Sequence, residues 1–125
     1  MRTIGILVFD DVEELDFVGP LEVFALASLS LNLKVLTVAE TPDEIRCRYG
    51  LRMIPSCSFR DCPPLDLLIV PGGPGARNQA RSSPAILEFV PQTAGFCRFR
   101  LHRRPGSGCR RRLEERKRHH PPQPL

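Results

Sequence analysis

The segment from Leu65 to Gly75 constrains the fold of this chain more than any other. Its core, Leu67-Leu68-Ile69-Val70, is an uninterrupted apolar run, as in a strand buried on both faces of a parallel sheet. A Pro-Gly-Gly-Pro-Gly turn over residues 71–75 ends the strand. Open α/β sheets bind ligands at the carboxyl ends of their strands, and glycines there let backbone N–H groups approach a ligand closely. The turn is therefore either an ordinary connection between a strand and a helix or a cradle for an oxyanion.

The segments before this strand predict a strand–helix–strand order. The runs Thr3–Phe9 and Lys34–Ala39 are apolar and predict two further strands. Between them, Pro20 fits the first turn of a helix, and Leu21 and Phe24 begin an apolar stripe beyond it. A strand–helix–strand order implies a right-handed crossover, and hence a parallel sheet.

The later segments complete one domain and then lose their pattern. Leu51–Pro55 predicts an edge strand, and a helix is expected from Ser83-Pro84 until Pro91 ends or kinks it. After Phe96 the residues follow neither a helical nor a strand period. We therefore expect a partial domain over residues 1–96 and a disordered tail over residues 97–125 that supplies no further strand.

The positive charge of the chain is concentrated in this tail. The formal net charge is +4, but residues 1–90 carry eight Lys and Arg against twelve Asp and Glu, whereas residues 91–125 carry ten against two. Such a tail could bind nucleic acid through phosphates. It lacks a recognisable binding module and has few aromatic residues for stacking, so a solvated tail is favoured and nucleic acid is not an expected partner. The tail also contains three histidines, His102, His119 and His120. A disordered tail gives them no preorganised site, so we expect neither a metal nor a cofactor.

The cysteine pattern predicts reduced thiols. The five residues are Cys47, Cys57, Cys62, Cys97 and Cys109. They form no C-x-x-C pair and no zinc-ligand spacing, and an odd number without a secretory signal favours a cytoplasmic protein. No apolar run approaches the roughly 20 residues that a transmembrane helix needs. The first three cysteines fall in irregular or edge segments, where buried or incidental thiols are expected rather than nucleophiles.

Acidic residues follow the first predicted strand. They are Asp10, Asp11, Glu13, Glu14 and Asp16. Most of them fit a solvated turn and the favourable position of negative charge at a helix N-terminus. Asp16 differs, because the apolar residues Leu15 and Phe17 flank it. An inward-facing carboxyl of this kind is expected to have a perturbed pKa and could transfer protons.

Three segments in this order and spacing resemble the ThiJ/PfpI family of the class I glutamine amidotransferase-like superfamily. They are Ile4–Asp10, Glu14–Phe24 and Asp66–Arg77, and the resemblance spans residues 2–96. The sequence is most similar to the isonitrile-hydratase-like branch and to the sensor domains of AraC-type transcription regulators. The resemblance implies a flavodoxin-like three-layer α/β sandwich, usually a homodimer, that takes a small-molecule substrate or ligand without a cofactor.

The resemblance also implies roles for individual residues. Asp16 stands where the family keeps its catalytic Asp or Glu, and Gly73 stands where the family's oxyanion-hole amide lies. The residues at expected substrate-binding positions are Gly19, Gly72 and Pro74. The family's nucleophile is a cysteine on a strained elbow, typically within Val-Cys-Thr-Gly-Ala, and this motif is absent from the chain.

Leu101 and His102 occupy the region where the nucleophile elbow is expected. One spelling of the codons for Arg98–Gly106, read one nucleotide later, encodes Gly-Ser-Val-Cys-Thr-Gly-Ala-Leu. Residues 118–121 can likewise be spelled so that the same frame gives Ala-Thr-Thr-His, another stretch typical of the family. We therefore predict that one extra nucleotide near the codons of Phe96 and Cys97 displaced the reading frame and truncated the domain.

The resemblance implies a cysteine-dependent hydrolase or hydratase, similar to isonitrile hydratases or amidases, that acts on a small C–N substrate. Without the nucleophile, this chain is expected to be inactive. The alternative is a small-ligand sensor domain related to AraC-type regulators. A regulator of that type would need a DNA-binding helix-turn-helix, which residues 97–125 do not contain.

Overall fold

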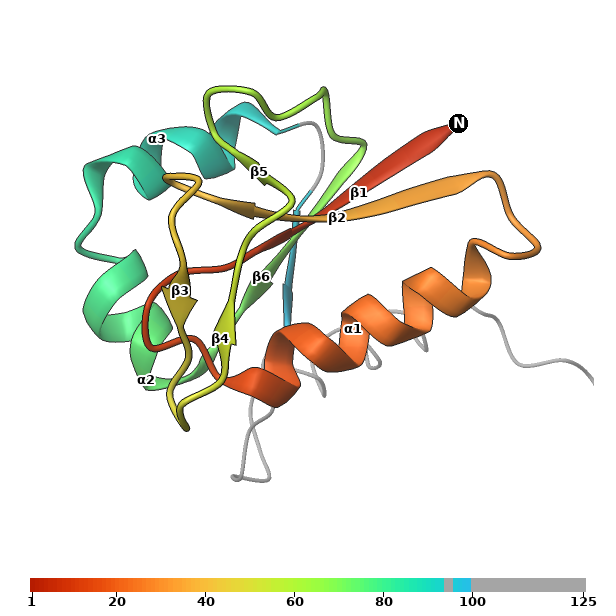
Figure 1. Ribbon diagram of the computed structural model, residues 1–125. Coiled ribbons are helices and arrows are strands. Elements are labelled where there is room, and N and C mark those ends of the chain that lie inside the picture. Colours follow the sequence, from red (N-terminus) through yellow and green to blue (C-terminus); the bar gives the residue numbers. More distant parts are fainter. Residues whose placement is uncertain (94–95, 100–125) are drawn as a thin grey trace, which may run out of the picture.

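The central element of the fold is a parallel five-stranded sheet in the order β5-β2-β1-β6-β7 (Figure 1). The computed structural model describes residues 1–93 and 96–99, and for 96–99 only the backbone. The strands of the sheet are β1 (Arg2–Leu7), β2 (Leu33–Ala39), β5 (Cys57–Ser58), β6 (Leu67–Pro71) and β7 (Phe96–Phe99). A separate antiparallel hairpin consists of β3 (Ile45–Arg46) and β4 (Arg52–Met53). The helices are α1 (Glu14–Ala27), the short α2 (Gly73–Gly75), the π-helical turn η1 (Ala76–Ala80) and α3 (Pro84–Gln92).

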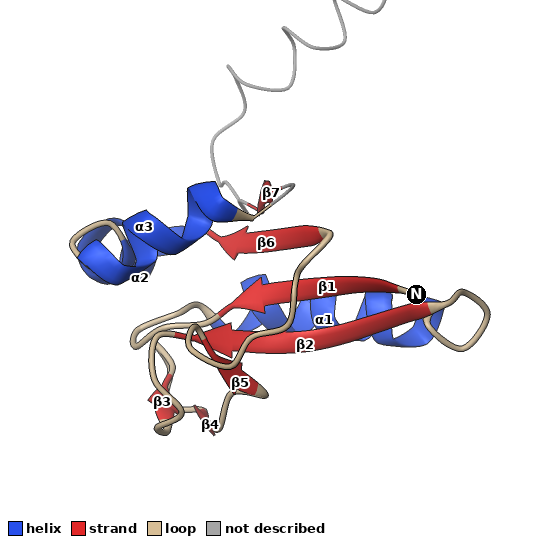
Figure 2. Cartoon of the chain, turned by 90° about the horizontal axis from the view of Figure 1, so that it is seen from above, coloured by secondary structure: helices blue, strands red, loops and turns tan. Residues whose placement is uncertain are grey.

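The strand order reverses at β1, which occupies the middle of the sheet. The chain adds β2 and then β5 on one side of β1, and β6 and then β7 on the other (Figure 2). Ile4 of β1 pairs with Val35 of β2 and with Leu67 of β6. In open α/β sheets such a reversal leaves a crevice at the carboxyl ends of the two central strands. The connections that follow β1 and β6 therefore meet at the same place.

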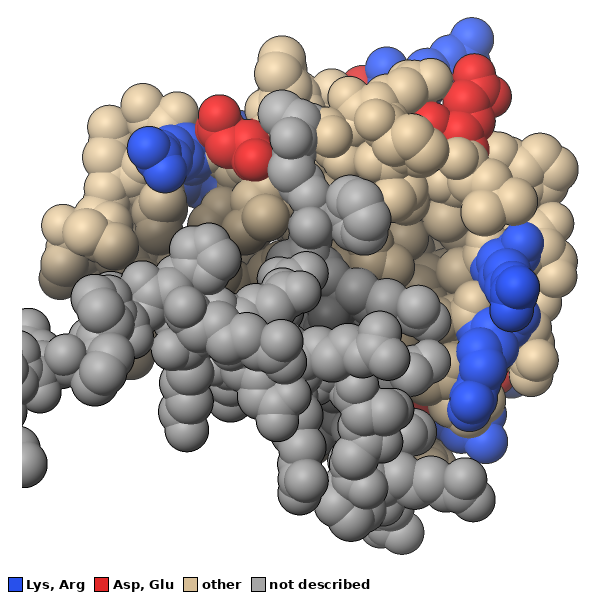
Figure 3. Space-filling view, turned by 180° about the vertical axis from the view of Figure 1, so that it is seen from behind, with Lys and Arg blue, Asp and Glu red and all other residues tan. Residues whose placement is uncertain are grey.

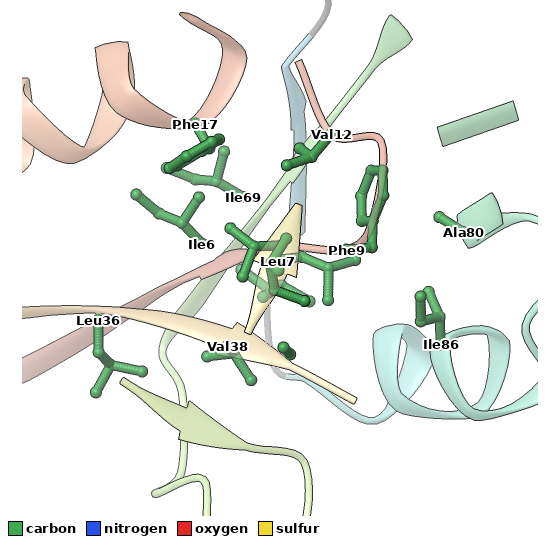
Figure 4. Packing of buried hydrophobic residues seen from close by; sticks show 14 of the residues in the cluster. Ile6, Leu7, Phe9, Val12, Phe17, Leu36, Val38, Ile69, Ala80 and Ile86 are labelled. Carbon is green, nitrogen blue, oxygen red and sulfur yellow. The ribbon is translucent and has the colours of Figure 1, made fainter. Parts of the chain in front are cut away.

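The core lies on both faces of β1, as its continuous apolar sequence requires. Ile6, Leu7 and Val8 are completely buried. On one face, Phe17 of α1 lies near Ile6 and Ile69 (Figure 4). Toward the carboxyl end of the sheet, α3 contributes buried Ile86. The predicted parallel α/β architecture is confirmed.

α3 begins as the sequence predicts, and it ends one residue after its internal proline. The hydroxyl of Ser83 accepts a hydrogen bond from the Ile86 amide at 3.4 Å, and Pro84 is the first helical residue. The Phe89 ring stacks on Phe59, which follows β5, with ring centroids 4.1 Å apart. This stack ties α3 to the edge of the sheet.

The expected start of the first helix at Pro20 is wrong. The helix α1 begins at Glu14, and Pro20 lies inside it, where it is buried. Pro20 has no N–H, so the Asp16 carbonyl lacks the amide donor that a helix normally supplies four residues later. The acidic side chains of Glu14 and Asp16 in the first turn favour a helix N-terminus there.

The edge strand predicted within Leu51–Pro55 is confirmed for Arg52 and Met53, but it pairs with β3 in the separate hairpin, and β5 occupies the edge of the main sheet. The expectation that no strand follows Phe96 fails for residues 96–99, where β7 pairs with β6 in parallel. The predicted disorder of the tail concerns residues that, beyond 99, lie outside the described residues.

Candidate functional site

Asp16 lies in the first turn of α1 and is the only buried charged side chain among the described residues. Its exposed fraction is 2%, and its Oδ1 atom has no hydrogen-bond partner among the described residues. Burial raises the pKa of the Asp16 carboxyl, and the nearby Glu13 carboxylate raises it further. The predicted inward orientation is confirmed, but its cause differs from the expected one. Leu15 is exposed while Asp16 and Phe17 face the interior, so the helical period places the carboxyl there rather than apolar neighbours on both sides.

Glu13 is a part of this site that the sequence did not single out. It occupies the N-cap position of α1 in extended conformation, but its side chain makes no capping hydrogen bond. Its carbonyl oxygen accepts a hydrogen bond of 3.1 Å from the Asp16 amide. The side chain is left free to extend toward the loop after β6, where it lies against Gly73.

Gly73 lies directly against both carboxyl groups. A Cβ atom on Gly73 would stand 3.1 Å from Glu13 Oε2 and 3.8 Å from Asp16 Oδ2. The two oxygens are thus less than 7 Å apart, since both distances are measured from one point. Gly73 also has a φ of +87°, a conformation that residues with a side chain rarely adopt. Glycine therefore suits this position both because of its backbone conformation and because of the close approach of the Glu13 carboxylate. The structure therefore brings Asp16 and Gly73 together, while the catalytic roles that the resemblance implies for them stay predictions.

The other predicted site residues stand in different settings. Gly72 is buried immediately after β6, and Pro74 opens the short helix α2. Gly19 lies one helical turn beyond Asp16, and a Cβ atom there would meet nothing within 4 Å. Roles in substrate binding stay predictions for all three.

A second close approach fixes the loop after β6 against the loop after β1. A Cβ atom on Gly75 would overlap the carbonyl oxygen of Asp11 and stand 2.6 Å from its carbonyl carbon. Asp11 itself has a φ of +67°, which is uncommon for a residue with a side chain. The glycine at position 75 is thus required by a backbone contact that holds the Gly73 turn beside α1.

Three acidic residues at the start of α1 also bind the hairpin. Asp10 Oδ1 accepts a hydrogen bond of 3.1 Å from the Arg46 amide, and the Glu14 carboxylate accepts one of 2.9 Å from the Tyr49 amide. Asp11 forms an ion pair of 3.4 Å with Arg48. These carboxylates are exposed or half-buried beside the N-terminus of α1, in agreement with the prediction, and in addition each of them holds the β3–β4 hairpin against the start of the helix.

The described thiols are poorly suited to nucleophilic attack. Burial raises the pKa of Cys47 to about 11 and that of Cys57 to about 12, and it also raises the pKa of Cys62. A thiol reacts through its thiolate, so these values oppose reactivity at neutral pH. The side chain of Cys97, all of Cys109 and the three histidines lie outside the described residues.

Two cavities lie near the carboxyl end of the sheet. The larger, about 480 Å³, lies between the end of β6 and the helices that follow it, and Arg77 and Arg81 stand among its mainly apolar lining. The smaller, about 160 Å³, lies beyond β1 and β2, and its lining includes Asp10 and Glu40. Neither of these two cavities is lined by Asp16 or Gly73, and the carboxyl–glycine pair is defined here by its contact geometry.

Within residues 1–93 and 96–99, no three His, Cys, Asp or Glu side chains are grouped so that they could hold a metal ion. In the same residues, no helix is long and apolar enough to cross a membrane. On the face seen in Figure 3, most of the described surface is uncharged, and basic side chains lie at its margins. Beyond residue 99, the basic tail predicted to be solvated lies outside the described residues.

Comparisons with known proteins agree on one family. The family model described as DJ-1/PfpI matches residues 2–95. An isonitrile hydratase from Pseudomonas putida is 35% identical over 96 residues, which are 77% of this chain and 40% of that protein. A ThiJ/PfpI family protein from Pseudomonas syringae has a TM-score of 0.66 and 25% identity, over 78% of this chain and 41% of its own. A DJ-1 superfamily protein from Salmonella typhimurium has a TM-score of 0.63 and 21% identity, over 78% of this chain and 55% of its own. The chain thus spans about two fifths of the length of the curated relative it matches.

Proposed function

The chain belongs to the DJ-1/PfpI family, and from this membership we propose that its Asp16–Gly73 site binds a small C–N compound of the isonitrile or amide class without turning it over. The observation that carries this proposal is the buried Asp16 carboxyl, which has an oxygen without a hydrogen-bond partner among the described residues and lies against Gly73. A buried polar group without a partner is costly. A ligand that donates a hydrogen bond to Asp16, or accepts its proton, would remove this cost.

The raised pKa of Asp16 suits a general acid. A carboxyl that keeps its proton closer to neutral pH can donate it to a reacting atom. Hydration of an isonitrile requires such a donor, because the terminal carbon must gain a proton. In a complete site, a cysteine thiolate would add to this carbon as Asp16 protonates it, which gives a thioimidate. Water would then add to the same carbon, with one of its protons passing to nitrogen and the other back to Asp16, and the thiolate would leave as a formamide is released.

This chain lacks the nucleophilic cysteine that the first step of this reaction requires. Residues 97–125 contain Cys97 and Cys109, and neither lies in the Val-Cys-Thr-Gly-Ala context of the family's nucleophile. The thioimidate intermediate is therefore not formed, and the chain is a binding protein at most. We attribute the loss to the extra nucleotide inferred from the codons around Phe96 and Cys97.

Ligand binding and turnover test this proposal separately. A small alkyl isonitrile and a small primary amide are titrated into the full chain, and formamide or acid formation is followed in the same samples. We expect binding without product, and loss of binding in Asp16→Asn. The matched control Glu88→Gln, which removes an exposed carboxyl from α3, should keep binding. Thiol-dependent turnover that Cys97→Ser abolishes would contradict the proposal.

A chain expressed from the gene with the one nucleotide removed tests the inferred ancestry. We expect it to release product, and replacement of the cysteine in its restored Val-Cys-Thr-Gly-Ala motif by serine to abolish release. If this chain also binds without turnover, the sensor alternative is favoured. If no shifted frame of the gene encodes the motif, the inferred frame displacement is wrong.

A further inference from the structure

The larger of the two cavities lies apart from the Asp16–Gly73 site. It encloses about 480 Å³ between the end of β6 and the two helical segments η1 and α3, and neither Asp16 nor Gly73 is part of its lining. Small-molecule sites typically have volumes of roughly 300–1,000 Å³. The cavity is therefore large enough for a ligand of its own.

Most of the cavity lining is apolar. Its apolar residues include Val70 of β6 and Ile86, Leu87 and Val90 of α3. Ile86 is buried and Leu87 is 56% exposed, so this lining runs from the interior of the domain to its surface. Ala80 of η1 lies at the same end of the fold as Ile86 (Figure 4), and its small methyl group leaves space between the two segments. An apolar chain placed here would lose its contact with water, which favours binding.

Two arginines, one within the π-helical turn η1 and one directly after it, line the same cavity. Arg77 and Arg81 are four residues apart, a spacing that puts two side chains on one side of a helical turn. The Arg81 amide donates a hydrogen bond of 3.0 Å to the Ala76 carbonyl, five residues earlier, as a π-helical turn requires. Such turns are frequent at functional sites. Both arginines are exposed, so their guanidinium groups are accessible to a ligand.

Arg77 and Arg81 have no acidic partner among the described residues. The ion pairs in this part of the chain are made by Arg48 and Arg52, and no Asp or Glu is among the described residues that line the cavity. Two guanidinium groups at one cavity repel each other, and an anion bound between them offsets this repulsion. Arginine also binds a carboxylate through two parallel N–H···O hydrogen bonds. The charge of the cavity therefore favours an anionic ligand.

We propose that this cavity binds a carboxylate with an apolar chain of medium length, such as a fatty acid. Arg77 and Arg81 hold the carboxylate, and the chain lies along the apolar lining beside Ile86. A carboxylate suits the cavity better than a phosphate ester, which carries a charge of about −1.5 to −2, because a larger charge costs more to remove from water beside apolar side chains. The site is additional to the one proposed for Asp16 and Gly73.

The two parts of such a ligand contribute in different ways. Each methylene group that enters the apolar part of the cavity should tighten binding about fourfold. The carboxylate makes binding sensitive to ionic strength, because Arg77 and Arg81 are exposed and salt screens exposed charges. A ligand that has only the chain, or only the charge, should therefore bind much more weakly than one that has both.

Titration calorimetry of the full chain with octanoate at low ionic strength tests the site. We expect saturable binding of one octanoate per chain. Binding should be at least about tenfold weaker for 1-octanol, which lacks the charge, and for acetate, which lacks the chain. No isonitrile or amide is present, so the result does not depend on the function proposed for Asp16. Absence of saturable binding, or 1-octanol binding as tight as that of octanoate, would overturn the inference.

Variants that remove one positive charge locate the bound carboxylate. Arg77→Gln and Arg81→Gln should each raise the dissociation constant of octanoate at least about tenfold, and circular dichroism checks that each variant is folded. The matched control is Arg2→Gln, because Arg2 is also an exposed arginine but begins β1, at the opposite end of the parallel sheet. It should leave the dissociation constant unchanged. Equal losses in Arg2→Gln and Arg81→Gln would mean that octanoate responds only to the net charge of the chain, and the inference would fail.

Discussion

Gly75→Ala should destabilise the domain strongly, although it adds only one methyl group. The added Cβ would overlap the Asp11 carbonyl oxygen and lie 2.6 Å from its carbon, where ordinary contact begins at 3.4 Å. The Asp11 peptide must therefore shift by at least about 0.8 Å, and it has little freedom to do so. Its amide donates a hydrogen bond of 2.9 Å to the Arg46 carbonyl, and its side chain forms the ion pair with Arg48.

The expected loss follows from these contacts. Overpacking against backbone costs about 1–3 kcal/mol, and weakening the Asp11 hydrogen bond adds about 1 kcal/mol. We therefore expect a loss of about 3 kcal/mol in the free energy of unfolding. This is a large part of the 5–15 kcal/mol that is typical of a domain. At a denaturant slope of about 1.5 kcal/mol per molar, the urea midpoint should fall by about 2 M.

The same substitution at Gly19 is the matched control. Gly19 lies inside α1, and a Cβ there meets nothing within 4 Å, so Gly19→Ala should gain up to about 1 kcal/mol from helix propensity. Both variants are compared by urea titration with circular dichroism, at the same protein concentration. If Gly75→Ala proves as stable as the parent, the contact between the loops after β1 and β6 does not limit the packing, and the reasoning fails.

Three further predictions concern the site, the thiols and the aromatic stack. The raised pKa of Asp16 means that the folded state binds its proton more tightly than the unfolded state. Its contribution to stability therefore falls as pH rises from 3.8 through the folded pKa. Asp16→Asn should be more stable than the parent at pH 7 but not below pH 3.8. A stability difference that does not depend on pH would contradict this. The pKa of Cys47 is raised from 9.0 to about 11. Its thiol should therefore react with iodoacetamide at neutral pH at least about 100-fold more slowly in the folded than in the urea-unfolded chain, as measured by peptide mass spectrometry. Equal rates would refute the raised pKa. Alanine at Phe59 and Phe89, singly and together, should give a coupling energy of about 1 kcal/mol in a double-mutant cycle of urea unfolding, and additive effects would mean that the stack contributes nothing.

The sheet was predictable because its central strands are buried on both faces. Short uninterrupted apolar runs such as Ile6–Phe9 and Leu67–Val70 are typical of strands that are buried on both faces of a parallel sheet. The start of α1 could not be predicted correctly, because Pro20 is typical of a first helical turn but lies here inside the helix. The packing of Phe17 and Pro20 against the sheet outweighs the loss of one helical hydrogen bond. The strand β7 has no apolar period, and its backbone pairing with β6 defines it instead.

Only part of the candidate site could be predicted from the sequence. Asp16 and Gly73 could be named because their motifs resemble those of a known family. Glu13 carries a weak local signal, since a position three residues before Asp16 lies on the same side of a first helical turn. The requirement for glycine at position 75 has no local signal, because Asp11 reaches it only through the folded sheet.

The central place of β1 in the sheet has a consequence for how the chain is made. β1 is synthesised before the other strands of the sheet. Its neighbour β6 follows much later, since Thr3 and Asp66, which hydrogen-bond at the start of the two strands, are 63 residues apart in sequence. Until then one edge of β1 is open, and only β1, α1 and β2 can assemble from local contacts. Contacts of such long sequence separation form slowly, and an unpaired apolar edge is prone to associate with other chains. The nascent chain is therefore most vulnerable to aggregation in the interval between the synthesis of Ala39 and that of Pro71.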